Sequence, residues 1–478
     1  MFSGIVLSQI HGIPERLILK DGPGNQVGKY AKSGYAGPAE LKKVLDKKLR
    51  IYQDKGHPFA SFSFDSLSYR NNSGLISGNF LPGPVILNGD LLVHGDSSFH
   101  LGMLRRWLGF RKDEAFSLSR TERIPALLKS SSLAESWKEP EIEWFGNQAI
   151  LHLYLKKSSP GNFSGILGLL PGQGSDKQML LTGNLDASFV NLFRQGISLQ
   201  FRWARFAPSS QQAVLQATFP SITFAGLGLS GGFELFRQDS LYFNRKVAAE
   251  LSVPLLGLWK FRLGAQAIQA SQAESNGRPA LNQGVQSMIL GAEMETVPAG
   301  RIRPDRSFLS FRLLPGLKFR NEAGINSRYS QLELRAKAQS ALFHNGRRFW
   351  LRGNADAGLL RSDGLMLSDQ FRLGGLRSIR GFNENQFFST AHCLLGLQPG
   401  WLLESGFMAS IFLDGMLYQS SLDAWNWNGY RQLLGFGVSA EFEAGKNLIQ
   451  LSIANGWAMG ESIDIQSSKI HFGYLAFF

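Results

Sequence analysis

The chain has 478 residues, of which 44% are apolar and 18% charged, and its net charge is +13. Its apolar content is too high for a disordered chain, and the single cysteine, Cys393, excludes an internal disulfide framework and a thiolate metal site. No run of about 18 apolar residues occurs, which excludes a bundle of transmembrane helices. A membrane β-barrel stays open, because alternation hides its apolar face and keeps mean hydropathy near zero, here −0.09.

The positive charge is spread along the chain, with no arginine-rich tail or dense basic stripe. A mildly basic surface is therefore favoured over a nucleic-acid partner. The first twelve residues, MFSGIVLSQIHG, lack the basic and apolar segments of a secretory signal. Either the protein is cytosolic or its true N-terminus lies upstream of Met1.

Residues 1–83 mix helix and strand and form the first predicted domain. Apolar residues at three- and four-residue steps predict a helix over 39–55, which Gly56, His57 and Pro58 end. Alternation predicts a strand from Pro58 to about 70, and NNSG at 71–74 predicts a hairpin turn. A less clear strand is expected at 15–20.

Residues 84–158 form the second predicted domain. Its elements are a strand over 84–94, helices over 100–111 and 119–136, and a closing hairpin of strands over 141–145 and 149–157. The order is strand, helix, helix, strand, strand. Residues 1–83 show a similar order, which makes the N-terminal part a pair of α+β domains.

From 161 to 478 the helical period is absent, and alternating runs of about ten residues replace it. In 259–267, for example, the apolar Trp259, Phe261 and Leu263 alternate with the charged Lys260 and Arg262. About sixteen such runs can be counted, centred near 165, 183, 200, 215, 231, 249, 263, 289, 312, 335, 353, 393, 410, 437, 450 and 474.

A soluble β-sandwich also alternates, but it usually closes with seven to nine strands. Sixteen runs would then need two soluble domains, and no linker interrupts 161–478. Runs of this length suit tilted strands that cross a bilayer. The sequence therefore predicts an all-β transmembrane barrel of about 16 antiparallel strands.

The last run, KIHFGYLAFF, places Phe472, Tyr474 and Phe478 on one face, and the chain stops on that aromatic residue. A buried closing strand of a soluble sheet is the alternative, although soluble termini usually fray into water. The terminal Phe478 with apolar residues at every second position resembles the assembly signal of bacterial outer-membrane barrels.

The longest interruption, 361–389, separates the eleventh and twelfth runs and contains the sequence FRLGGLRSIRGFNE at 371–384. Gly374 and Gly375 permit a tight backbone path there. The tip follows as Ile379, Arg380, Gly381 and Phe382. An arginine aimed into a barrel lumen needs a carboxylate partner, because a buried unpaired charge costs several kcal/mol.

Asp414 is the candidate partner. It lies in the run ASIFLDGMLY at 409–418, where Ile411 and Leu413 belong to the lipid face, so Asp414 points into the lumen with Ser410 and Phe412. Gly381 should leave no room for a Cβ, and Phe382 should pack on the inner wall.

These features resemble the POTRA-barrel superfamily of outer-membrane assembly and secretion proteins, which includes BamA, TamA and the two-partner-secretion transporters. The resemblance covers nearly the whole chain: 1–83 and 84–158 look like POTRA domains, and IRGF at 379–382 looks like the family's inward-folded loop tip. It implies a bacterial outer-membrane barrel with periplasmic N-terminal domains. Unfolded client polypeptides would bind at POTRA strand edges, and periplasmic chaperones or accessory lipoproteins are further candidate partners.

The sequence also departs from the family. BamA carries five POTRA units against about two here, and the plug helix of two-partner transporters is not evident. The family often has an acidic residue on the twelfth strand near the loop arginine, but AHCLLGLQPG at 391–400 contains none. Asp414 must then supply most of the charge compensation, with Glu384 and Glu404 as fallback candidates.

The sequence predicts neither an enzyme nor a cofactor. Its eight histidines are scattered, nucleophile and phosphate-loop motifs are absent, and the adjacent His392 and Cys393 should point to opposite faces of a strand. Three functions stay open: an assembly or insertion factor, a dedicated secretion pore, and a structural surface barrel without transport.

Overall fold

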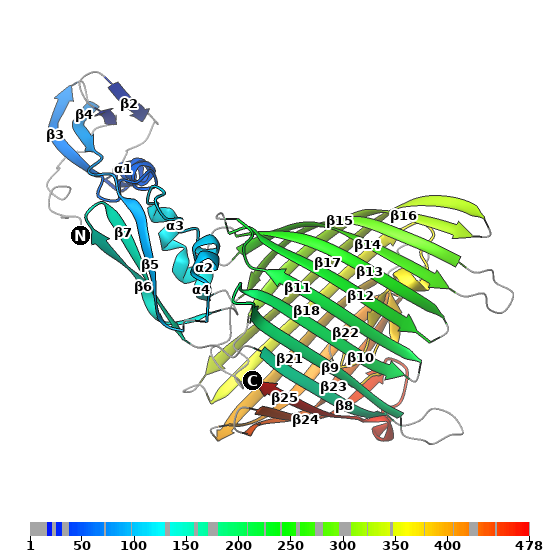
Figure 1. Cartoon of the computed structure of the whole chain (residues 1–478). Helices are drawn as coiled ribbons and strands as arrows, with labels where there is room; N and C mark the ends of the chain where they lie inside the picture. The colour runs from blue at the N-terminus through cyan, green and yellow to red at the C-terminus, as the bar shows by residue number, and fades with distance from the viewer. Residues whose placement is uncertain are drawn as a thin grey trace. The chain divides into compact units, whose positions relative to one another are not determined.

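The computed structural model describes residues 17–21, 25–30, 38–70, 73–96, 98–129, 134–156, 161–170, 180–207, 209–223, 226–239, 241–254, 259–272, 281–295, 307–322, 324–344, 348–376, 378–404, 406–419, 429–444 and 447–477. The chain forms two compact units. One consists mainly of residues up to Leu155, and the other contains Lys156–Phe478 together with two short earlier segments. Figure 1 shows the elements of each unit.

The N-terminal unit begins with a four-stranded sheet in the order β2-β1-β4-β3. Its elements are β1 (Leu17–Asp21), β2 (Asn25–Tyr30), α1 (Pro38–Gln53), β3 (Ser61–Arg70) and β4 (Ser73–Leu81). The helix predicted over 39–55 is therefore present, and β3 and β4 form the predicted hairpin, although two residues of its turn lie outside the described residues. The second strand was not predicted, because NQVGKY has no clear alternation.

A three-stranded sheet follows in the order β5-β7-β6. Its elements are β5 (Leu87–Gly95), α2 (Leu101–Leu108), α3 (Leu118–Glu122), α4 (Ile124–Lys129), β6 (Glu135–Phe145) and β7 (Gln148–Lys156). Alternate residues of β7, such as Leu151 and Leu153, are fully buried. Among the described residues, no helix has the length and apolar character needed to cross a membrane.

Two predictions for this sheet were wrong in detail. The single helix expected over 119–136 is two short helices, because Pro125 lacks the N–H that a continuous helix would need there. The strand expected at 141–145 begins at Glu135 instead. Pro140 obscured it, but an edge strand such as β6 tolerates proline.

Asp54, just after α1, connects that helix to the start of α3. Its carboxylate accepts hydrogen bonds from the Ser119 N–H at 2.8 Å, the Ser119 hydroxyl at 2.8 Å and the Ser117 hydroxyl at 2.9 Å. Partial burial by itself would raise the pKa of Asp54, but these hydrogen bonds outweigh it and lower the pKa below its usual value. Arg50, one turn earlier on α1, forms an ion pair with Glu122.

The second unit is a closed barrel of 16 antiparallel strands, in which the last strand pairs with the first. The strands are β8 (Gly161–Leu170), β9 (Leu180–Leu192), β10 (Ile197–Ala207), β11 (Ser210–Phe219), β12 (Gly228–Gln238), β13 (Tyr242–Pro254), β14 (Trp259–Gln272), β15 (Leu281–Glu295), β16 (Phe308–Glu322), β17 (Ile325–His344), β18 (Phe349–Ser362), β21 (Ala391–Glu404), β22 (Phe407–Gln419), β23 (Tyr430–Ala444), β24 (Asn447–Ala458) and β25 (Lys469–Phe477). Each of the sixteen predicted centres falls within one of these strands, so the predicted barrel is confirmed.

Inward and outward residues alternate along the barrel wall. On β22, Ile411 and Leu413 are 50% and 48% exposed on the outer face. The residues between and beside them, Ser410, Phe412 and Asp414, are at most 4% exposed and face the lumen. The outer face is therefore an apolar belt of the kind that a lipid bilayer covers.

Candidate functional site: the inward loop of the barrel

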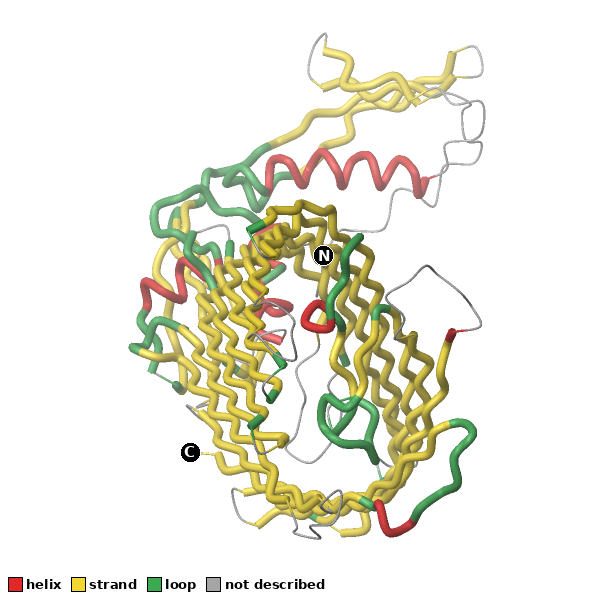
Figure 2. The backbone as a smooth tube through the Cα atoms, turned by 90° about the vertical axis from the view of Figure 1, so that its right-hand side faces the viewer, coloured by secondary structure: helices red, strands yellow, loops and turns green. Residues whose placement is uncertain are grey.

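The segment between β18 and β21 folds into the lumen and is called the inward loop (residues 363–390). It contains a short 3-10 helix, Leu367–Asp369, and the paired strands β19 (Phe371–Leu373) and β20 (Phe387–Ser389). Its contacts include lumen-facing residues of β13 and β22, which lie seven places apart in the ring of 16 strands. Figure 2 shows loop segments inside the ring of strands.

Arg380 at the loop tip is paired with Asp414 on β22. The Arg380 Nε and Nη2 atoms donate to Asp414 Oδ2 and Oδ1, both at 2.7 Å, and the Arg380 N–H donates to Oδ2 at 3.3 Å. Their side chains are 15% and 1% exposed, respectively. A bidentate, charge-assisted and buried pair is the strongest arrangement that these two side chains can form.

Two further residues complete the surroundings of Arg380. Its Nη1 donates to Gln398 Oε1 at 3.0 Å, and Gln398 Nε2 donates to the Ser410 hydroxyl at 3.0 Å. The guanidinium carbon lies 3.7 Å from the centre of the Phe412 ring, a cation–π distance. Gln398 is on β21, the strand that lacks the family's acidic residue, and supplies a neutral acceptor there.

Sequence reasoning missed Gln398, although its position carried a signal. Gln398 lies an even number of residues after His392 on β21, so both side chains face the lumen. Gly396, two residues before Gln398, is paired with Asp414. The fallback candidates serve other purposes: Glu384 accepts a hydrogen bond from the Leu376 N–H at 2.8 Å, and Glu404 is exposed at the end of β21.

Glycines allow the loop tip to lie directly on the wall. Gly381 has φ +91°, and a Cβ there would lie 2.2 Å from the carbonyl oxygen of Asn455 on β24. A Cβ on Gly435 of β23 would lie 2.0 Å from the Arg380 carbonyl oxygen, and one on Gly456 would lie 2.7 Å from the Phe382 ring. The loop tip can therefore lie against the barrel wall only because these three residues are glycines, as predicted for Gly381.

The other expected loop residues also lie at this tip. Gly374 and Gly375 have φ of +119° and +90°, which residues with a Cβ rarely adopt. Ile379 is fully buried in an apolar cluster against which Phe382 packs, and Phe382 also contacts Phe387 edge to face at 5.1 Å.

A second attachment, not predicted from the sequence, holds the opposite end of the loop. Lys318 on β16 forms an ion pair with Asp369, and the two side chains are 0% and 4% exposed. Gln283 Nε2 on β15 donates to Asp369 Oδ1 at 2.9 Å and to the Ser368 hydroxyl at 2.7 Å. The alternation along β16 indicates that Lys318 faces the lumen. Its partner depends on the path of the loop, which the sequence does not reveal.

Arg372 on β19 adds an aromatic contact to this attachment. Its guanidinium carbon lies 3.6 Å from the centre of the Phe236 ring, and Nη1 lies 3.5 Å from the Tyr242 hydroxyl. Phe206, Phe236 and Tyr242 form a buried aromatic column on β10, β12 and β13. The loop therefore bridges the lumen, with its tip on one wall and its base on the other.

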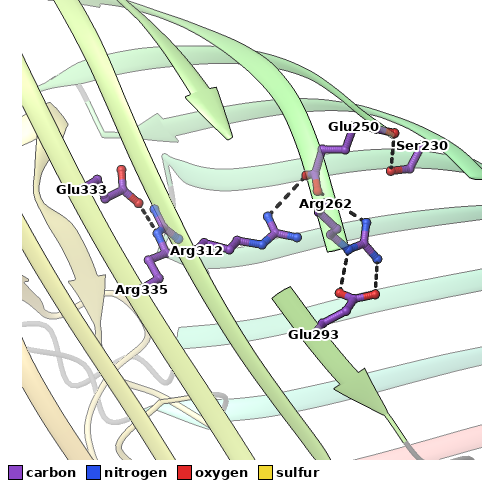
Figure 3. A network of polar contacts seen from close by, with 7 residues as sticks. All are labelled: Ser230, Glu250, Arg262, Glu293, Arg312, Glu333 and Arg335. Atoms are coloured by element: carbon purple, nitrogen blue, oxygen red, sulfur yellow. Dashed lines mark hydrogen bonds and ion pairs between the residues drawn. The ribbon is translucent and has the colours of Figure 1, made fainter. Parts of the chain in front are cut away.

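Charged side chains also pair along the inner wall (Figure 3). Arg262 on β14 contacts Glu250 on β13 and Glu293 on β15, with its Nε at 2.6 Å from Glu293 Oε2. Arg312 on β16 reaches Glu250 at 3.3 Å. Charges of both signs thus balance across four adjacent strands.

A polar cavity of about 450 Å³ lies between another part of the inner wall and the inward loop. Arg202, Glu234, Lys246 and Arg335 are among its lining residues, together with His392. Cys393 is exposed on the outer face, which confirms that it and His392 point to opposite sides of β21.

The closing strand places its aromatic residues outward. Phe472 and Tyr474 are 47% and 39% exposed, and β25 pairs with both β24 and β8. Phe478 lies outside the described residues, so its part in the expected assembly signal stays a prediction.

These observations define a class: closed barrels of 16 antiparallel strands with a loop fastened inside the lumen. No protein-family model matches the chain, and no curated protein sequence matches it. Solved structures do share its fold. CdiB from Acinetobacter baumannii has a TM-score of 0.61 and 12% identity, over 93% of this chain and 83% of that one.

Two further structures are similar. CdiB from Escherichia coli has a TM-score of 0.58 and 15% identity, over 100% of this chain and 92% of that one. BamA from Haemophilus ducreyi, in a structure lacking POTRA domains 1–3, has a TM-score of 0.50 and 14% identity, over 93% and 95% of the two chains. The chain therefore has the barrel fold of BamA and CdiB.

Proposed function

We propose that this protein is a bacterial outer-membrane barrel of the BamA and CdiB type that inserts client polypeptides into the membrane or moves them across it. The Arg380–Asp414 pair carries the proposal, because it fixes in the lumen the loop tip on which the family resemblance rests. The shared barrel fold and the apolar outer belt support a location in the outer membrane. No catalytic chemistry or cofactor is part of the proposal.

In this proposal the N-terminal unit is periplasmic and consists of POTRA-like domains. Its two sheets end on the edge strands β2, β3, β5 and β6, whose backbone groups can pair with an extended client strand. Clients would then reach the barrel as extended chains, with chaperones or accessory lipoproteins assisting delivery.

A dedicated secretion pore is the second candidate. The polar cavity beside the inward loop favours it, because a lumen lined by charges of both signs suits a hydrated, extended polypeptide. A purely structural surface barrel would need no such cavity and no double attachment of the loop.

Depletion of the protein in its native host separates these functions. An insertion factor should lower the amounts of other folded outer-membrane barrels, whereas a pore should lower one exported protein and leave the barrels unchanged. Complementation with the Arg380→Ala variant should fail in either case. The Arg237→Ala variant is the control, since Arg237 is exposed on the outer face of β12 and does not line the lumen cavity. Unchanged barrels and exported proteins after depletion would reject both functions.

A further inference from the structure

The outer wall over β13–β17 carries a polar groove near the rim. The groove measures about 580 Å³, and no acidic side chain lines it. The exposed side chains that line it are Arg245, Gln269, Asn282, Phe319, Asn321, Asn326 and Arg328, of which only Phe319 is apolar. The groove lies beside the turn between β16 and β17. The chain enters the barrel at the start of β8, and successive antiparallel strands cross the wall in alternate directions. β16 is the ninth strand, so it ends at the rim opposite to the point of entry.

A second groove of about 720 Å³ adjoins it farther from the rim and is apolar. Ala249, Ala265 and Ala267 form its floor on β13 and β14. Larger outward side chains rise around this floor: Val247 and Met288, both 55% exposed, and Leu317, 38% exposed. Neighbouring alanines between taller side chains leave a channel that an acyl chain can fill.

The two grooves follow one another along the strands. On β13 the outward residue changes from Arg245 to Val247, and on β14 it changes from Gln269 to Ala267. The register pairs Arg245 with Gln269 and Val247 with Ala267, so both strands change character at the same level. The step from polar to apolar takes one pair of residues, about 7 Å along a strand.

The two outward arginines of the polar groove, Arg245 and Arg328, lack acidic partners among the described residues, whereas Arg320, a lumen-side residue that also lines it, is paired with Glu322. Within the described part of the chain, neither Arg245 nor Arg328 forms an ion pair, and the Arg328 guanidinium lies over the Phe319 ring at 5.5 Å. On the lumen side, by contrast, Arg262 and Arg312 are each paired with glutamates. Guanidinium groups bind phosphate well, so the groove is complementary to a phosphorylated headgroup.

The spacing of the two outward arginines favours a headgroup with two phosphates. They stand on β13 and β17, four strand spacings or about 19 Å apart at the backbone, and both line the groove. A broad headgroup with a phosphate at each end can engage both side chains as they extend outward, whereas a single phosphate would need both to fold toward each other over the groove. The width of the apolar groove, across β13–β16, likewise suits several acyl chains.

We propose that this surface binds one doubly phosphorylated glycolipid of the membrane, with its phosphates at Arg245 and Arg328 and its acyl chains over the alanine floor. The inference goes beyond client handling, because it uses only the outer wall and no residue of the inward loop. It assigns β13–β17 as a fixed lipid contact.

The test uses the full-length protein, purified in detergent, with binding measured by native mass spectrometry. Diphosphoryl lipid A should bind at least tenfold more tightly than monophosphoryl lipid A, and dioleoylphosphatidylcholine should bind weakest. The double variant Arg245→Gln/Arg328→Gln should lose at least tenfold in affinity for diphosphoryl lipid A. The control Arg237→Gln, an outward arginine outside the groove, should leave the affinity unchanged.

A second arm leaves the charges intact. The variant Ala265→Leu/Ala267→Leu fills the apolar floor and should also lower the affinity at least tenfold, with unchanged gel migration of the unheated folded barrel. Equal binding of all three lipids would overturn the proposal, and so would full competition by inorganic phosphate, which would indicate an anion site without a lipid. Lipid binding is measured without clients, so its failure leaves the proposed function intact.

Discussion

The Arg380–Asp414 pair gives the sharpest prediction. Asp414→Ala leaves the Arg380 guanidinium in the lumen with Gln398 and Phe412 but no carboxylate. Loss of one partner of a buried pair costs about 3–5 kcal/mol, and the 15% exposure of Arg380 favours the lower end. A cost of about 3 kcal/mol should raise the population of released loop by roughly two orders of magnitude.

Hydrogen–deuterium exchange of the peptide covering 374–384 measures that population in the full-length protein. Exchange should accelerate roughly 100-fold in Asp414→Ala and by a similar factor in Arg380→Ala, and the double variant should be little faster than either. Asp414→Asn keeps one acceptor and should fall between wild type and Asp414→Ala. Arg202→Ala, which breaks a partly exposed pair, should change exchange only slightly. Fully additive effects in the double variant would refute the claim that these residues act as a pair.

Three further predictions concern other parts of the chain. Gly435→Ala should displace the loop tip, because its Cβ would meet the Arg380 carbonyl oxygen at 2.0 Å, and accelerated exchange of the loop should report it. Gly415→Ala, whose Cβ meets nothing within 4 Å, should be silent; equal effects would contradict the packing argument. Asp54 has a lowered pKa, so its stabilisation is present above its unfolded pKa, near 3.9, and is lost as pH falls through the lower folded value. At acid pH the Ser119 amide should lose protection from hydrogen exchange in the wild type and in the exposed control Asp90→Asn, but not in Asp54→Asn. An Asp54→Asn pH profile identical to that of the wild type would contradict this prediction. Deletion of 474–478 should lower the amount of barrel assembled in the outer membrane, measured by its heat-dependent gel migration, because a terminal strand recognised by edge pairing acts before closure. Normal assembly would exclude the C-terminal signal.

The barrel could be predicted from the sequence because one face of its wall is apolar and the other is polar. A lipid-facing side chain and a lumen-facing side chain alternate along strands such as β14 and β22, so a period of two marks these strands in the sequence. Asp414 was identified for the same reason, since parity alone places it inward. Parity also explains why Cys393 and His392 separate.

The missing parts depend on contacts between segments far apart in the sequence. Gln398 becomes a partner of Arg380 only through the register of β21 and β22. The Lys318–Asp369 pair depends on where the base of the loop lies, and no periodicity encodes that path. Pro125 is a local signal for the break between α3 and α4. It stands among residues that otherwise favour a helix, and their apolar pattern led to the prediction of one continuous helix.

The two attachments of the inward loop have a consequence for how current would pass through the barrel. Each attachment can be made or broken by itself, and neither shares a residue with the other. A loop released only at its tip would stay attached through Asp369 and move about that point. A loop released only at its base would stay attached through Arg380 and move about it. A single barrel in a planar bilayer should therefore switch among discrete conductance levels instead of widening continuously, and Lys318→Met and Asp414→Ala should each remove a different level.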